Sequence, residues 1–258
     1  MELDGQSAIV TGGGRGIGRA IALELAGMGA HVVVAEMNEA NGERVAEEVR
    51  ALGKRAVAVR TDVTNRGDLL TLVQRTMDEF GRIDVLVNNA GIYRAQPALE
   101  IDDRHWDSVM DINAKAVFFA SQAVLPHMVA AKRGTIISLA SMAGKLGSTT
   151  SPVYAASKSA VISLTRSLAL TFAADGIRAN CVCPGFVQTD MWTEVERGVS
   201  TVLGTTVEEI NRQRLAQIPL KRWETADDVA RVVGFLASEK SAYVTGEAIN
   251  VSGGLVMH

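Results

Sequence analysis

Short apolar segments rich in β-branched residues alternate along the chain with longer segments of helical period. Several short segments are apolar nearly throughout, which is typical of strands buried on both faces of a parallel sheet. The strands are predicted at Ser7–Thr11, His31–Ala35, Ala56–Arg60, Ile83–Asn88, Gly134–Leu139, Ile177–Cys183 and Ala248–Val251. The helices are predicted at Gly18–Met28, Glu39–Leu52, Asp68–Phe80, Asp103–Ala131, Val153–Ala174 and Asp227–Ala237.

Glycines stand just past four of these helical segments, where a left-handed C-cap favours glycine: Gly29, Gly53, Gly81 and Gly176. Regular alternation of strands and helices predicts right-handed βαβ units and a parallel sheet. The sequence contains no internal repeat, low-complexity tract or linker. We therefore expect one α/β domain over residues 1–258, a doubly wound parallel sheet flanked by helices.

One polar segment, Asp190–Gln217, interrupts this alternation between the sixth strand and the last helix. Loops of that length inside a compact domain are usually functional. Because the segment follows the carboxyl end of a strand, where ligands bind in such sheets, we predict that it is a mobile lid over a substrate.

The bulk composition excludes several classes of partner. The chain is 47% hydrophobic and 21% charged, its formal net charge is −3, and no block of like charge favours a nucleic-acid or anionic-membrane surface. The N-terminus lacks the basic and apolar regions of a signal peptide, and no apolar run reaches about 18 residues. We expect a cytoplasmic protein that spans no membrane.

The cysteines and histidines predict neither a disulfide nor a metal site. Cys181 and Cys183 stand two apart in a predicted strand, where they share a face but cannot bridge each other, so we interpret them as buried thiols in a reducing compartment. None of the histidines has the spacing of a metal ligand; they are His31, His105, His127 and His258.

A glycine-rich turn follows the first predicted strand and opens the first helix. It has the spacing T-G-x-x-x-G-x-G, with Gly12, Gly16 and Gly18. Such a turn needs residues that tolerate unusual φ angles and leaves backbone N–H groups open to a pyrophosphate. A merely flexible turn is the alternative, but the strand–turn–helix context predicts a dinucleotide site.

Glu36 ends the second strand, 18 residues after Gly18. A carboxylate there can accept hydrogen bonds from both adenosine ribose hydroxyls, and it would repel a 2′-phosphate. Arg15 in the glycine turn could favour that phosphate, and Glu36 could instead be a solvated acid at a strand end. Since Met37 and Asn38 bring no second cation, we predict NAD in preference to NADP.

Tyr154 and Lys158 share one face at the start of a predicted helix, at positions i and i+4. Free tyrosine titrates at about pH 10, too high for a base at neutral pH. An ammonium about 4 Å away would lower that pKa by about three units and make a phenolate accessible. Alone, this spacing is weak, because most such pairs are surface packing.

The glycine turn, Asn88-Asn89-Ala90-Gly91, Ser141, Tyr154-x-x-x-Lys158 and Pro184-Gly185 together resemble the short-chain dehydrogenase/reductase family, in order and spacing over essentially the whole chain. The resemblance implies a Rossmann-type fold of seven parallel strands, usually assembled as a homotetramer. It implies that Tyr154 exchanges a proton with the substrate oxygen, that Lys158 lowers the Tyr154 pKa and holds the nicotinamide ribose, and that Ser141 bonds the carbonyl. A loop serine at 141, with Ser138 as the rival, is the alternative.

The resemblance also implies that Asn113 holds a proton-relay water near Lys158, although a helix-interior amide could simply bond its own backbone. The residues implied to bind the cofactor are Gly12, Arg15, Gly16, Ile17, Gly18, Glu36, Asp62, Val63, Asn89, Ala90, Gly91, Tyr154, Lys158, Pro184, Gly185, Val187 and Thr189.

Two substrate classes compete. The segment Cys183–Trp192 looks like the acetoin (diacetyl) reductase/2,3-butanediol dehydrogenase branch, which favours a small diol, hydroxyketone or polyol; Trp192 could equally be packing. The ending Ala242–Glu247 resembles 3-oxoacyl-[acyl-carrier-protein] reductases. Those enzymes carry an arginine where this chain has Asp175, so an acidic carrier would meet only Lys132 and Arg133.

The remote alternative is a non-catalytic nucleotide-binding protein on the same fold. The presence of Ser141, Tyr154 and Lys158 argues against it.

Overall fold

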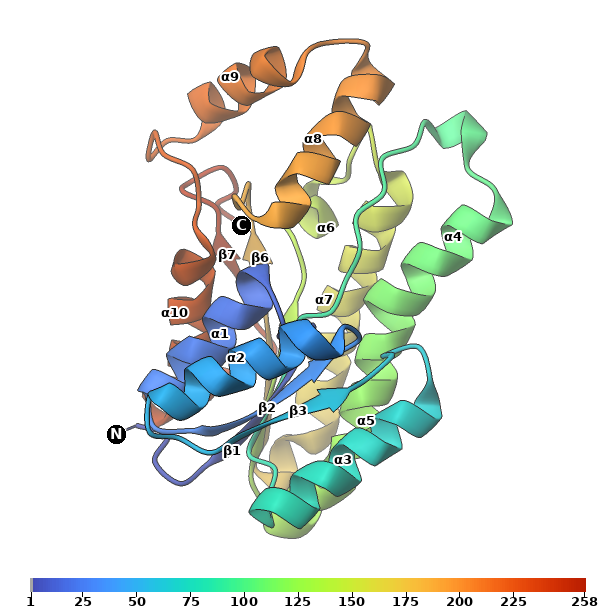
Figure 1. The fold of residues 1–258 in the computed structure, drawn as a ribbon. Helices are drawn as coiled ribbons and strands as arrows, with labels where there is room; N and C mark the ends of the chain where they lie inside the picture. The colour runs from blue at the N-terminus through green and yellow to red at the C-terminus, as the bar shows by residue number, and fades with distance from the viewer. Residues whose placement is uncertain (1) are drawn as a thin grey trace.

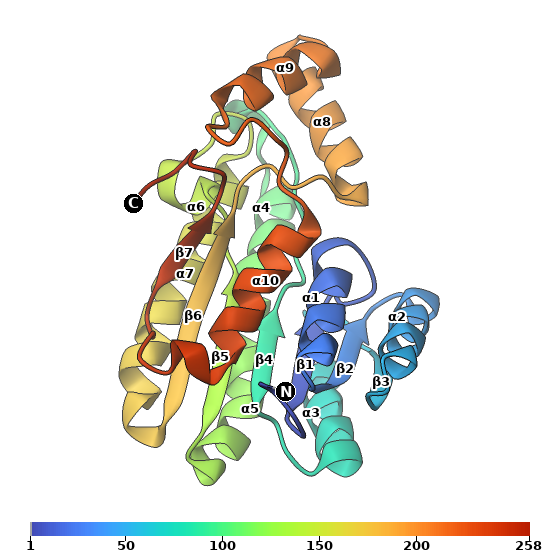
Figure 2. The ribbon, with the colours of Figure 1, turned by 90° about the vertical axis from the view of Figure 1, so that its left-hand side faces the viewer.

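Seven parallel strands form one sheet (Figure 1), in the order β3-β2-β1-β4-β5-β6-β7 (Figure 2). The computed structural model describes residues 2–258, the side chains of residues 190, 191 and 194 excepted. The strands are β1 (Ser7–Thr11), β2 (His31–Glu36), β3 (Ala56–Arg60), β4 (Val85–Asn88), β5 (Gly134–Leu139), β6 (Ile177–Pro184) and β7 (Ala248–Val251). All seven predicted strands are present, with end shifts of two residues or fewer, and the expected doubly wound sheet is confirmed.

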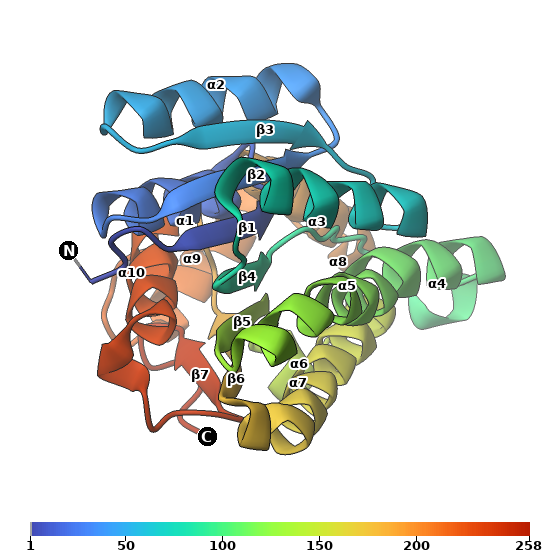
Figure 3. The same ribbon diagram turned by 90° about the horizontal axis from the view of Figure 1, so that it is seen from below.

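Helices cover both faces of the sheet, as Figure 3 shows from below. One face carries α1 (Gly16–Gly27), α2 (Glu39–Ala51) and α10 (Ala226–Ala237), and the other α3 (Arg66–Phe80), α5 (Ala116–Ala131) and α7 (Pro152–Phe172). The first strand shows why: Ala8 and Val10 belong to the apolar cluster on the α1 face, whereas Ile9 belongs to that on the α3 face. An apolar run is therefore needed because both sides of the strand are covered.

The glycines predicted to follow helices all have positive φ angles: Gly29 at 113°, Gly53 at 77°, Gly81 at 68° and Gly176 at 73°. The left-handed conformation expected at these positions is confirmed, and it lets each chain segment turn back toward the next strand.

The single helix predicted over Asp103–Ala131 is interrupted. The structure has α4 (Asp103–Met110), a π-helical turn at Asp111–Lys115, and then α5. Asn113, in that turn, bonds the backbone of a neighbouring loop, and insertion of one residue into the helical ladder is how such a turn re-aims a side chain. The whole stretch is long and apolar enough to cross a membrane, but Val124, Leu125 and Met128 are buried against the sheet.

The polar segment Asp190–Gln217 is not a loop. It forms two helices, α8 (Asp190–Leu203) and α9 (Val207–Gln217), which lie beyond the upper end of the sheet in Figures 1 and 2. Val199 and Ile210 are buried, so each helix has an inner apolar contact that the polar composition obscured. Thr206 accepts a hydrogen bond from the Glu209 N–H at 3.2 Å, and this T-x-x-E pattern was the available sequence signal for the second helix.

Candidate active site

A cavity of about 870 Å³ opens at the carboxyl ends of the strands. It lies where β1 and β4 are neighbours, the point from which the chain builds the sheet toward β3 on one side and toward β7 on the other. It is lined by every residue predicted to bind cofactor or substrate except Asn113. One cavity therefore joins the glycine turn, the Tyr154 region and α8–α9.

The glycine turn approaches its neighbours too closely for side chains. A Cβ on Gly18 would lie 2.1 Å from the Gly12 carbonyl oxygen. The Asn89 side chain donates to the carbonyls of Thr11 and Gly12, both at 3.0 Å, and so holds the turn against the end of β4. Because α1 begins at Gly16, its free N–H groups face the cavity, as a phosphate-binding turn requires.

Glu36 is fixed beside this turn. One carboxylate oxygen accepts a hydrogen bond from the Gly14 N–H at 3.1 Å, and the other accepts one from the Asn38 N–H at 3.2 Å. Glu36 and Arg15 both line the cavity at this end. A carboxylate held by two backbone donors is a fixed negative charge, not a freely solvated strand end.

The structure separates the two candidate serines. Ser138 is buried, and its hydroxyl accepts a hydrogen bond from the Asn88 side chain at 3.3 Å. Ser141 lines the cavity beyond the end of β5, where its hydroxyl accepts a hydrogen bond from the Ala143 N–H at 3.1 Å. Only Ser141 is therefore placed to meet a ligand in this cavity.

Tyr154 lies in the first turn of α7, where Pro152 occupies a position that needs no N–H donor. Lys158 lies one turn further, buried, and its Nζ donates to the Leu139 carbonyl oxygen at 2.6 Å. The Lys158 Nζ is 5.7 Å from the centre of the Tyr154 ring. The structure thus brings the two side chains to one wall of the cavity together with Ser141.

The expected lowering of the Tyr154 pKa is wrong for the structure as it stands. Burial raises the pKa of Tyr154 to about 12, although the Ser141 hydroxyl partly opposes this. Burial also lowers the pKa of Lys158 to about 8. Desolvation penalises the charged form of both groups, and it is the largest cause of each shift.

Asn113 lies behind the cavity wall rather than on it. Its side-chain oxygen accepts from the Ile92 N–H at 2.8 Å, and its amide donates to the Ile92 carbonyl at 2.9 Å and to the Ser157 hydroxyl at 3.2 Å. A Cβ on Gly91 would lie 3.2 Å from the Asn113 oxygen and 3.6 Å from the Lys158 Nζ. The amide therefore fixes the backbone beside Lys158, and its proposed relay water stays a prediction.

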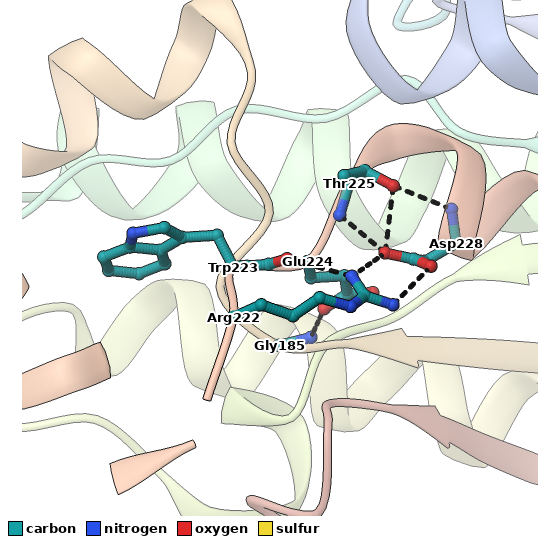
Figure 4. Close-up of polar contacts among 6 residues, drawn as sticks. All are labelled: Gly185, Arg222, Trp223, Glu224, Thr225 and Asp228. Atoms are coloured by element: carbon teal, nitrogen blue, oxygen red, sulfur yellow. Dashed lines mark hydrogen bonds and ion pairs between the residues drawn. The ribbon is translucent and has the colours of Figure 1, made fainter. Parts of the chain in front are cut away.

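Sequence reasoning missed a buried carboxyl group beneath the loop that follows β6. Glu224 accepts a hydrogen bond from the Gly185 N–H at 2.7 Å (Figure 4), and its backbone carbonyl accepts one from the Gln188 N–H at 3.0 Å. Gly185 and Val187 line the cavity, so Glu224 fastens a cavity-lining loop from behind. No motif pointed to it, because the contact joins segments nearly forty residues apart.

Burial raises the pKa of Glu224 to about 8. The adjacent cation does not compensate, because Arg222 forms a two-bond ion pair with Asp228, at 2.6 and 2.9 Å, and holds the pKa of Asp228 well below its usual range (Figure 4). The second oxygen of Glu224 is buried without a hydrogen-bond partner among the described residues. Glu224 therefore carries a proton at neutral pH.

Aromatic side chains line the end of the cavity under α8 and α9. Tyr93 packs edge-on against Tyr154, with ring centres 4.9 Å apart. Phe186 and Trp192 pack edge-on at 5.8 Å, and the Arg214 guanidinium lies 4.9 Å from the centre of each of these two rings. Sequence reasoning singled out only Trp192 of this group, as either packing or substrate contact.

Both thiols are buried and free, as predicted for Cys181 and Cys183. Among the side chains that the structure describes, no group of three or more His, Cys, Asp or Glu could hold a metal ion. The two cations considered for carrier docking are each paired with a carboxylate: Lys132 with Asp175, and Arg133 with Asp84 at 3.2 Å.

Comparison with known proteins agrees with this geometry. The short chain dehydrogenase family profile matches residues 6–200. The chain is 39% identical over 253 residues to a 3-oxoacyl-[acyl-carrier-protein] reductase FabG of Staphylococcus aureus, covering 98% of both chains. It is 36% identical over 257 residues to the FabG of Thermotoga maritima, covering 100% of both.

Two similar solved structures are of enzymes that are named for different substrates. An NAD+-bound xylitol dehydrogenase superposes with a TM-score of 0.95 at 31% identity, covering 98% of this chain and 100% of the other. A 7α-hydroxysteroid dehydrogenase in complex with NADH superposes with a TM-score of 0.92 at 33% identity, covering 100% and 96%. The resemblance to acetoin reductases is not confirmed by these relatives. The chain belongs to the short-chain dehydrogenase/reductase family and is an NAD(P)-dependent oxidoreductase acting on CH–OH groups.

Proposed function

We propose that the protein interconverts a 3-hydroxyacyl and a 3-oxoacyl group, with Tyr154 as the acid/base. The observation that carries the proposal is the convergence of Ser141, Tyr154 and Lys158 on the cavity that the glycine turn also lines. The 3-oxoacyl part rests on the relatives named 3-oxoacyl-[acyl-carrier-protein] reductase, which match over nearly the whole chain.

Each side chain of this group has a distinct task. Tyr154 delivers a proton to the carbonyl oxygen in reduction and removes it from the hydroxyl in oxidation. Ser141 donates to the same oxygen, which stabilises the negative charge that develops there. Lys158 places positive charge beside the phenol and would bond the nicotinamide ribose. A bound cofactor would supply or accept the hydride and, when oxidised, would add a positive charge that lowers the pKa of Tyr154.

The cofactor would lie with its pyrophosphate at the start of α1, in the turn of Gly12, Gly16 and Gly18. Its adenosine ribose would face Glu36, whose fixed carboxylate favours the two free hydroxyls of NAD over the 2′-phosphate of NADP. Pro184, Gly185, Val187 and Thr189 would enclose the nicotinamide, with Glu224 holding their loop from below.

A small diol or polyol is the second candidate substrate. It is favoured by the ion pairs of Lys132 and Arg133, which leave neither cation free for an acidic carrier protein. The superposition on xylitol dehydrogenase is consistent with it.

A substrate panel tests the proposal. Initial rates would be measured with NADH and NADPH for a 3-oxoacyl thioester, free 3-oxobutanoate, diacetyl and a ketose. We expect the 3-oxo compounds to have the higher kcat/KM. Faster turnover of diacetyl or the ketose would favour the second candidate, and no turnover of any of them would contradict the proposal.

A further inference from the structure

Arg214 occupies an unusual position at the substrate end of the cavity. It comes from α9, which lies above the strand ends in Figure 1, and its guanidinium lies over both Phe186 and Trp192, 4.9 Å from each ring centre. Arginine favours such stacking because its charge is planar and weakly hydrated. The stacking fixes the direction of the guanidinium at the cavity wall.

This half-buried cation has no carboxylate partner among the described side chains. No carboxylate among them lies within ion-pair distance of Arg214. Glu196, an acidic group near it, already accepts a hydrogen bond from Asn211 at 2.5 Å. Burial lowers the pKa of Arg214, yet a guanidinium stays protonated in proteins.

Two N–H donors at this place are shut off from water and have no acceptor among the side chains that the structure describes. They are the Arg214 Nη1 and the Trp192 Nε1. A buried donor without an acceptor is costly, so most are satisfied by protein, water or ligand. Both side chains line the cavity, so a ligand bound there can supply the acceptor that they lack.

Tyr93 lies near both Arg214 and the proposed acid/base, Tyr154. Its ring packs against Tyr154 at 4.9 Å, and its phenol is the other acidic group that acts on the pKa of Arg214. Tyr93 is therefore near both groups, and all three side chains line one cavity. A short acid bound there can place its reacting carbon at Tyr154 and its carboxylate at Arg214.

We infer that Arg214, with Trp192, binds the carboxylate of a short hydroxy or oxo acid whose reacting carbon lies at Tyr154. A single cation matches a single negative charge, whereas a phosphate dianion would call for more donors. The inference rests on the proposed function and refines it: the 3-oxoacyl group enters as the free acid. The paired states of Lys132 and Arg133 agree with a substrate that needs no carrier protein.

The test compares an anion with its neutral counterpart. Wild type, Arg214→Met, Arg214→Lys and Arg212→Met would be assayed with 3-oxobutanoate, its methyl ester and its N-acetylcysteamine thioester. Arg212 is the matched control, because it lies on the same helix, is exposed and pairs with Glu209. Thermal unfolding would confirm that each variant folds.

We expect wild type to favour 3-oxobutanoate, and Arg214→Met to raise its KM by about 10²-fold with a smaller change in kcat. The ester should change by less than about threefold, Arg214→Lys should keep part of the preference, and Arg212→Met should match wild type. Equal losses for the acid and the ester, or no preference for the acid in wild type, would overturn the inference.

An equilibrium measurement separates this inference from the proposed function. Quenching of tryptophan fluorescence by 3-oxobutanoate, with the oxidised cofactor present so that no reduction occurs, reports binding beside Trp192 and the adjacent Trp223. Quenching that Arg214→Met weakens and Arg212→Met does not would support the anion site even if no substrate were turned over. Quenching of equal strength in wild type and Arg214→Met would contradict it, whatever the catalytic activity.

Discussion

The Lys158 Nζ lies 5.7 Å from the centre of the Tyr154 ring, and burial moves the pKa values of the two groups apart, to about 8 for Lys158 and about 12 for Tyr154. The first proton lost by the pair therefore leaves with a pKa of about 8 and comes mainly from Lys158. A minor fraction of the singly deprotonated pair has the phenolate and the ammonium instead. That form is the base that alcohol oxidation needs.

A pH profile tests this coupling. The kcat/KM for oxidation should rise with pH and level off above about 8, and that for reduction should fall above the same value, because reduction needs the protonated pair. Lys158→Met should move the inflection upward, toward the value near 12 set by Tyr154 alone. An unchanged inflection in Lys158→Met would show that the pair does not titrate as a unit.

Glu36→Arg should reverse the cofactor preference. The wild-type carboxylate is held by the Gly14 and Asn38 N–H groups where it would repel a 2′-phosphate, and a guanidinium there would attract one. We expect the ratio of kcat/KM for NADH over NADPH to fall by about tenfold or more. Glu39→Arg, at an exposed position on α2, is the charge-matched control. A tenfold wild-type preference for NADPH would contradict the NAD assignment.

Glu224→Gln should change how stability depends on pH. The folded-state pKa of about 8 lies above the ordinary 4.5, so the folded state holds the extra proton between these values. This contribution is present below about pH 4.5 and is lost as pH rises through 8. Glutamine stays neutral, so the variant should gain stability relative to wild type as pH rises from 5 to 9.

Urea unfolding at a series of pH values would measure this difference. Asp227→Asn, an exposed acid on α10, controls for the loss of one negative charge. A parallel pH dependence in Glu224→Gln and wild type would show that Glu224 does not carry the extra proton.

The sequence predicted the features that depend on spacing between residues close together in the chain. Gly18 had to be glycine because its Cβ would collide with the Gly12 carbonyl, and Tyr154 and Lys158 share a face because of helical geometry. These positions follow from short-range spacing, so the motif predicted both the fold and the chemistry. The strands could also be predicted from the sequence, because burial on both faces of the sheet requires mostly apolar segments such as Ser7–Thr11.

The features of the site that the sequence did not predict depend on contacts between segments far apart in the chain. Glu224 meets Gly185, and Arg214 meets Phe186 and Trp192, only after the chain has folded. The rise in the Tyr154 pKa was missed for the same reason, because a charge pair is visible in the sequence whereas its desolvation is not. The polar composition of α8 and α9 favoured a loop because only Val199, Ile210 and a few other positions face inward.

The central claim is that Tyr154 exchanges the proton at the reacting oxygen, and kcat of Tyr154→Phe tests it most directly. The phenylalanine ring keeps the packing against Tyr93 but removes the ionisable oxygen. Thermal unfolding and cofactor affinity should therefore match wild type, whereas kcat should fall by about 10²–10⁴-fold. A folded Tyr154→Phe protein that keeps more than about a tenth of wild-type kcat would contradict the mechanism.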